Sequence, residues 1–147
     1  MNGGLNSQDP YDYLTVDPLN YKFITVGGAE YTAYFVECKE LGFPDIYWFG
    51  FDKNTDAKIS DKRIHTTIIK IIQHFFCVRT RAIIFLCDLI DGNARIRHIL
   101  FERWFNRNTD GSFVKHNEIK DDLITSIIIA KDNPNLEIII EEFKNIF

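Results

Sequence analysis

The sequence has neither an excess of positive charge nor a long apolar run. Its net charge is −4, from 17 basic and 21 acidic side chains, whereas nucleic-acid-binding domains carry a basic face that neutralises phosphates. Four arginines fall close together with the spacing of a solvated helix face: Arg95, Arg97, Arg103 and Arg107. No apolar run reaches the roughly 18 residues of a membrane span, and no secretory signal follows Met1. The sequence therefore predicts a cytoplasmic protein that binds no nucleic acid and no membrane.

Cysteine is also scarce, and its count of three is odd. Cys38, Cys77 and Cys87 each lie in an apolar segment. Such a pattern is typical of buried, unpaired thiols in a reducing compartment, and it argues against a disulfide framework.

The sequence also lacks the spacing of a metal site. The four histidines do not have the paired spacing of zinc ligands. Residues 52–60 alternate oxygen-bearing side chains as a calcium loop does, but Ala57 and Arg63 stand where that loop needs glycine and a bidentate glutamate. We therefore predict no metal and interpret this segment as a polar loop that ends in a helix cap.

Apolar side chains are plentiful, at 46% of the residues, which is enough for one folded core. Turn-forming residues predict an irregular N-terminal arm over residues 1–19, followed by a single domain over 20–147. β-branched and aromatic runs predict strands at 21–26, 30–38, 46–51, 81–88, 113–119 and 123–130. Helical spacing predicts helices at about 61–76, 93–105 and 134–147. The predicted class is α+β, in the order β-β-β-α-β-α-β-β-α, with a mixed, mostly antiparallel sheet.

This order resembles the core of the GCN5-related N-acetyltransferase family, which has an antiparallel meander, a helix, a central strand, a second helix and a closing hairpin. The resemblance covers residues 20–131 and implies an acetyltransferase-like topology. In that family a glycine-rich turn holds the pyrophosphate of acetyl-CoA. The best matching segment here starts at Arg63, and its two glycine positions are Thr66 and Ile68.

The next helix of that family carries a tyrosine that protonates the leaving thiolate. Asn93, Ala94, Glu102 and Arg103 resemble the family pattern around it, but the tyrosine position is Phe101, which has no proton to give. The resemblance therefore implies the fold of an acetyltransferase without two of its chemical groups.

A second resemblance, to small uncharacterised proteins of Bacteroidetes-type bacteria, spans nearly the whole folded chain. It rests on four short segments: Tyr21-Lys22-Phe23, Asp61-x-Arg63-Ile64, Cys87-Asp88-x-x-Asp91-Gly92 with Arg97, and Phe101-x-x-Trp104. It implies a bacterial protein with a domain of unknown function, and no activity.

Five residues are predicted to bind a ligand: Asp61, Arg63, Asp88, Asp91 and Arg97. Asp88 ends a predicted central strand, which is the strand end where open α/β sheets bind ligands. The competing interpretation is turn and cap chemistry combined with salt bridges.

Three functions stay open on this pattern. The first is a non-catalytic module that binds a small ligand or a protein partner and needs no cofactor. The second is an N-acetyltransferase that uses acetyl-CoA at the same residues. The third is a self-associating regulatory protein, a homodimer that forms through aromatic side chains or the C-terminal helix. Whether the protein is an enzyme is left open by the sequence.

Overall fold

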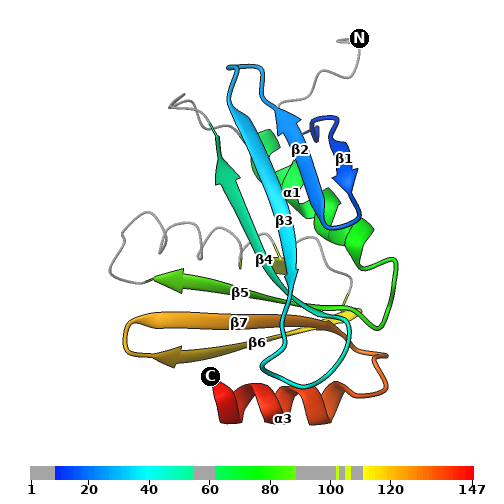
Figure 1. Cartoon of the computed structure of the whole chain (residues 1–147), viewed down its shortest axis with the longest axis vertical. Coiled ribbons are helices and arrows are strands. Elements are labelled where there is room, and N and C mark those ends of the chain that lie inside the picture. Colours follow the sequence, from blue (N-terminus) through cyan, green and yellow to red (C-terminus); the bar gives the residue numbers. More distant parts are fainter. Residues whose placement is uncertain (1–8, 55–61, 89–101, 103–104, 107–110) are drawn as a thin grey trace. The chain divides into compact units, whose positions relative to one another are not determined.

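The computed structural model describes residues 9–54, 62–88, 102, 105–106 and 111–147. Seven strands form a mixed sheet in the order β1-β2-β3-β4-β5-β7-β6 (Figure 1). Their bounds are β1 Leu14–Asp17, β2 Asn20–Ile24, β3 Glu30–Glu37, β4 Ile46–Lys53, β5 Ala82–Asp88, β6 Phe113–Lys120 and β7 Leu123–Ala130. β4 and β5 pair in parallel, whereas β1–β2, β2–β3, β5–β7 and β6–β7 are antiparallel. The α+β class and the mostly antiparallel sheet predicted from the sequence are confirmed.

Three helical segments accompany the sheet in the described part of the chain. α1 spans Lys62–Phe75 and α3 spans Leu136–Ile146. Of the predicted second helix, the structure describes Glu102, Phe105 and Asn106, and all three are helical. None of the described helices is long and apolar enough to cross a membrane.

One prediction about the N-terminal arm is wrong. Residues 14–17 form strand β1, where the sequence predicted irregular chain through residue 19. All four residues of β1 are exposed, so the strand has no alternation of buried and exposed side chains that could reveal it. Tyr11, which precedes β1, is buried, whereas Leu14 in β1 is 71% exposed.

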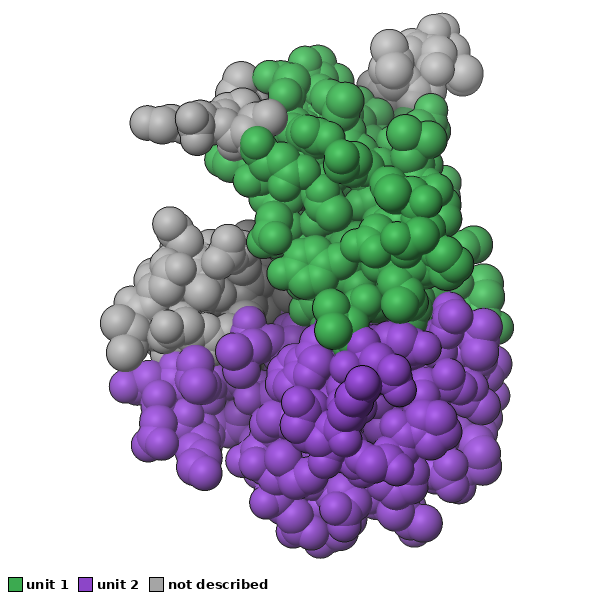
Figure 2. All heavy atoms as spheres, viewed as in Figure 1, with its two compact units in different colours: residues 1–36, 49–77 green, residues 37–48, 78–147 purple. Residues whose placement is uncertain are grey.

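The chain divides into two compact units (Figure 2). Unit 1 contains residues 1–36 and 49–77, and its core forms between the sheet and α1. Phe23 on β2 and Phe35 on β3 turn inward because alternate residues of a strand share a face. The ring of Phe35 stacks on that of Phe75 of α1, with 3.8 Å between centroids. The apolar stripe predicted for this helix is confirmed, since its members are all buried: Ile64, Ile68, Ile71, Ile72 and Phe75.

A tight turn closes the β2–β3 hairpin of unit 1, as the pair Gly27-Gly28 predicts. The backbone N–H of Gly28 donates to the carbonyl of Thr25, and the N–H of Thr25 donates to the carbonyl of Ala29. Gly28 has a φ of 84°, a conformation that glycine adopts without steric cost.

Unit 2 contains residues 37–48 and 78–147, and its central strand is β7. Every residue of β7 after Leu123 is buried, which means that both faces of this strand are covered. On one face, Ile127 and Ile129 belong to the same cluster as Ile139 and Phe143 of α3. The apolar stripe of the C-terminal helix therefore docks on its own sheet.

The cysteine prediction is right for one thiol and wrong for another. Cys38 is buried and unpaired, whereas Cys77 is unpaired and exposed. Cys77 lies just beyond the last residue of α1, where the chain turns with a hydrogen bond from its N–H to the carbonyl of His74. The side chain of Cys87 lies outside the described residues.

Candidate functional site

The predicted ligand residues fall largely outside the part of the chain that the structure describes. Asp61, Asp91 and Arg97 lie outside it. Asp88 is the last residue of β5, but only its backbone is described. Arg63, in the first turn of α1, is the one member of the set with a described side chain. The gathering of these five residues therefore stays a prediction.

The side chain of Arg63 is held by the N-terminal segment of unit 1. Its Nε donates a hydrogen bond of 2.8 Å to the carbonyl oxygen of Asp9. Its guanidinium carbon lies 3.9 Å from the centroid of the Tyr11 ring, a cation–π geometry that adds electrostatic attraction to packing. The backbone N–H of Tyr11 donates to Oγ1 of the buried Thr67, at 2.7 Å. Arg63 thus anchors the segment that precedes β1, a role that the sequence analysis missed.

The positions that match the glycine-rich turn of acetyltransferases lie inside α1. Thr66 donates its hydroxyl to the carbonyl of Lys62, one helical turn earlier. Ile68 is 2% exposed and belongs to the buried stripe of the helix. A turn that cradles a phosphate needs accessible backbone N–H groups and little side-chain bulk. Thr66 and Ile68 provide neither, because both lie beyond the first turn of α1 in regular helix and the side chain of Ile68 is in the core.

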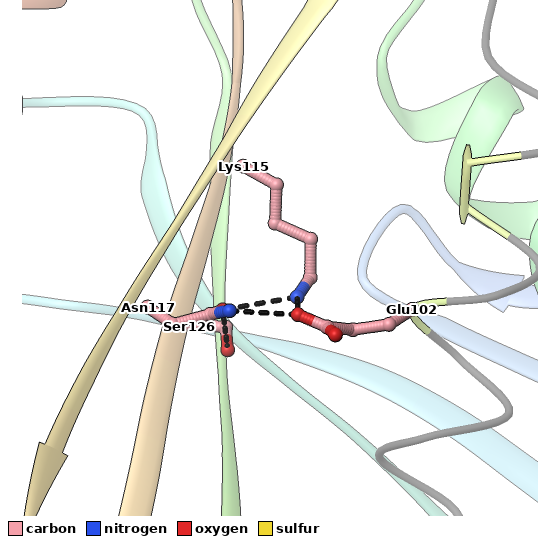
Figure 3. A network of polar contacts seen from close by, with 4 residues as sticks. All are labelled: Glu102, Lys115, Asn117 and Ser126. Atoms are coloured by element: carbon pink, nitrogen blue, oxygen red, sulfur yellow. Dashed lines mark hydrogen bonds and ion pairs between the residues drawn. The ribbon is translucent and has the colours of Figure 1, made fainter.

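A polar network lies within unit 2 (Figure 3). It is on the face of the sheet opposite α3, because Ser126 alternates along β7 with Ile127 and Ile129, which pack with α3. The ammonium of Lys115 on β6 donates to Oε1 of Glu102 at 2.6 Å and to Oδ1 of Asn117 at 2.9 Å. The amide nitrogen of Asn117 donates to the same carboxylate oxygen at 2.7 Å. Ser126 on β7 donates to Oδ1 of Asn117 at 2.6 Å. We call these four residues the Lys115 network.

The strand register brings the members of this network together. Asn117 pairs directly with Ser126 across β6 and β7, so their side chains point to the same face. Lys115 lies two residues before Asn117 and shares that face. Its ammonium also lies 5.6 Å from the centroid of Phe85 on β5. Glu102 reaches the group from the second helical segment, and its carboxylate is the counter-charge for the lysine.

The side chains of the network differ in their exposed fractions, and the burial of the lysine determines the role of the network. The Lys115 side chain is 8% exposed and that of Glu102 is 37% exposed, while Ser126 is fully buried. A buried ammonium must be paired, because its desolvation is costly. Glu102 and Asn117 supply the partners. The network therefore joins the second helical segment to the β6–β7 hairpin through satisfied hydrogen bonds.

The sequence contains one signal for this network. Ser126 stands in the middle of an apolar strand, Leu-Ile-Thr-Ser-Ile-Ile-Ile-Ala. A hydroxyl in a strand buried on both faces needs a polar partner.

Among the described residues, no group of three or more histidine, cysteine, aspartate or glutamate side chains could hold a metal ion.

The fold and the network define an α+β domain built on a mixed sheet. A model for a family of unknown function, DUF6169, matches residues 60–145 of the chain, and the chain belongs to this family. No curated protein and no solved structure matches it. The matched range contains the whole Lys115 network and all five predicted ligand residues. The bacterial origin implied by the second resemblance stays a prediction.

Proposed function

We propose that this protein is a non-catalytic module with an acetyltransferase-like topology that binds a small ligand or a protein partner. The observation that carries the proposal is the strand order β1-β2-β3-β4-β5-β7-β6, with a parallel β4–β5 pair and α1 as the crossover between them. It agrees with the meander, helix, central strand and closing hairpin of the acetyltransferase core. Fold alone does not define activity, so the chemistry must come from particular residues.

Two residues argue against acetyl transfer. Ile68 fills one glycine position of the family pattern and is buried within α1. Phe101 fills the tyrosine position, and its ring cannot protonate a thiolate. A scaffold that lacks both the phosphate cradle and the general acid retains the capacity to bind, without the means to transfer an acyl group.

The proposed ligand residues remain Asp61, Arg63, Asp88, Asp91 and Arg97, at the start of α1 and at and beyond the end of β5. Aspartates and arginines together suit a small polar ligand with groups of both charges, because arginine pairs with carboxylate or phosphate in a bidentate geometry. Arg63 already bonds to Asp9 and stacks on Tyr11. It would therefore contribute as a positioned cation rather than as a mobile one.

The first experiment measures thermal unfolding with CoA and with acetyl-CoA. A ligand at a hundred times its dissociation constant stabilises a protein by about 2.7 kcal/mol, which corresponds to roughly 5–11 °C in a chain of this size. We expect no shift with either compound and no acetyl transfer to amines. A shift of that size with both would instead favour the rival function, an N-acetyltransferase that uses acetyl-CoA.

The second experiment tests binding with inorganic phosphate and Mg²⁺ as probes for the arginines and the aspartates. We expect phosphate to raise the unfolding temperature of the wild type, and the effect to be lost in Arg97→Ala. Arg107→Ala, a substitution at another arginine of the same segment, is the matched control and should keep the shift. If neither probe shifts the transition, the proposed ligand residues do not form a site.

A further inference from the structure

The two edge strands of the sheet differ in how they are protected against pairing with another strand. β1 has four residues, its register shifts between Thr15 and Asp17, and Pro18 follows it directly. Short length, a bulge and proline are devices that prevent edge-to-edge association. β6 has eight residues from Phe113 to Lys120, in unbroken register with β7 and without proline. No described strand pairs with its other side.

The inward-pointing lysine of β6 does not protect this edge. Inward charges can prevent edge pairing, because a second strand would desolvate them. Lys115 is already 8% exposed and bonded to Glu102 and Asn117. Because its ammonium is directed over the face of the sheet, another strand beside β6 would remove little more water from it. Among the described strands, none occupies the outer edge of β6, so this edge remains open to pairing there.

The residues of β6 are complementary to β6 of a second copy. Two identical antiparallel strands in one sheet are related by a two-fold axis perpendicular to the sheet, so one residue faces its own counterpart and the axis passes midway between the two. An axis at Asn117 places His116 opposite Glu118 of the other copy, twice. It also places the exposed Ile119 opposite the stem of Lys115, and Val114 opposite the stem of Lys120.

Neighbouring registers lack this match. An axis at Glu118 sets two carboxylates against each other and His116 against Lys120. An axis at His116 sets two imidazoles against each other and Val114 against Glu118. Opposite charges that face each other across strands are favourable, and like charges are not. The edge therefore selects one register for a second copy.

We propose that β6 is a homodimer interface, in which two copies pair antiparallel around Asn117 and extend the sheet across the two-fold axis. The contact between His116 and Glu118 recurs on both sides of the axis. Within one chain these side chains already lie 2.6 Å apart and are 27% and 30% exposed. Pairing brings the second Glu118 to the same imidazole and covers Ile119, which is 70% exposed in the single chain. The partner is a second copy of this chain.

The test is sedimentation velocity on the full chain over a range of micromolar concentrations, with three variants. Glu118→Lys sets a lysine against His116 of the other copy, and we expect its dimer dissociation constant to rise at least about tenfold. The double variant His116→Glu/Glu118→Lys places a carboxylate opposite an ammonium across the axis and should restore the dimer. Glu141→Lys makes the same charge change on an exposed position of α3 and should leave the dimer unchanged.

Circular dichroism of each variant checks that it is folded. A wild type that stays monomeric over the whole range overturns the proposal. So does a dimer that Glu118→Lys leaves intact, because the interface would then lie elsewhere, with α3 as the surface expected from the sequence. Hydrogen exchange gives a readout independent of the variants, since the amides on the outer side of β6 should be protected at high concentration and lose that protection on dilution.

Discussion

Replacing Lys115 by methionine tests whether the Lys115 network stabilises the protein. Methionine keeps an unbranched apolar stem beside Phe85 but removes the ammonium that bonds to Glu102 at 2.6 Å and to Asn117 at 2.9 Å. Hydrogen bonds to charged groups contribute about 1.5–3 kcal/mol each to stability. Glu102 is 37% exposed, so water takes over much of the solvation of its carboxylate. We therefore expect a loss of about 2 kcal/mol, less than the roughly 3–5 kcal/mol for breaking a fully buried ion pair.

The opposite substitution should cost more. Glu102→Leu removes a carboxylate from the ammonium of Lys115, the more buried partner, and we expect a loss of about 3 kcal/mol. The double variant Lys115→Met/Glu102→Leu replaces the ion pair by an apolar pair and should cost less than the sum of the two single changes. A coupling energy of about 1–2 kcal/mol is expected for groups in direct contact.

Urea denaturation followed by circular dichroism measures these differences as shifts of the midpoint at constant slope. Lys131→Met is the matched control, because Lys131 directly follows β7 and is exposed. Its effect should stay within about 0.5 kcal/mol. If the stability lost in the double variant equals the sum of the two single losses within about 0.5 kcal/mol, the reasoning is refuted. The effects of independent sites are additive, whereas those of two residues in one ion pair are not.

Four further predictions rest on other contacts. In Gly50→Ala the new Cβ would lie 2.5 Å from the hydroxyl oxygen of Tyr34; we expect a loss of about 1–2 kcal/mol on urea denaturation, largely recovered in the Tyr34→Leu background. Iodoacetamide should alkylate the exposed Cys77 in the native protein and leave the buried Cys38 unmodified. The reason is that burial, reinforced by a hydrogen bond to a carboxylate, raises the pKa of Cys38 to about 11. Mass spectrometry of the peptides measures the modification of each thiol. Because of this raised pKa, the stability due to the Cys38 thiol is present below its ordinary pKa of 9.0 and is lost as pH rises toward 11. The free energy of unfolding of Cys38→Ala should therefore depend less on pH between 9 and 11 than that of the wild type. Phe143→Ala, at a fully buried position, should cost about 3–5 kcal/mol in the same denaturation assay.

The order of the elements could be predicted because burial is periodic along the chain. α1 carries an apolar stripe at helical spacing, and β7 is apolar on both faces. Such patterns report which side of an element meets the core. β1 has no buried side, since Leu14 and its neighbours are all exposed, and a four-residue strand without a buried face leaves no periodic signal. The sequence therefore predicts an arm where the structure has a strand.

The polar contacts could not be predicted, because they join residues that are distant in the sequence. The Arg63–Asp9 hydrogen bond spans 54 residues and the Tyr11–Thr67 hydrogen bond spans 56. A basic side chain at the start of a helix is compatible with solvent, a ligand or a tether, and local sequence does not distinguish among them. The charge of Arg63 and its place in the chain predict a ligand residue, and the structure adds that its side chain holds the N-terminal segment.

Some of the proposed features lie inside the range that matches the family and others lie outside it, which determines whether they should apply to other members of the family. Residues 60–145 contain β6, the Lys115 network and the five predicted ligand residues, whereas Asp9 and Tyr11 precede this range. Pairing through β6 depends on no residue outside the match, so it can hold for other members whatever precedes α1 in them. The tether on Arg63 does depend on such residues. Tyr11→Ala should therefore loosen the segment around Arg63 and leave the sedimentation of the β6 dimer unchanged; a dimer lost with Tyr11 would mean that the interface extends beyond the edge strand.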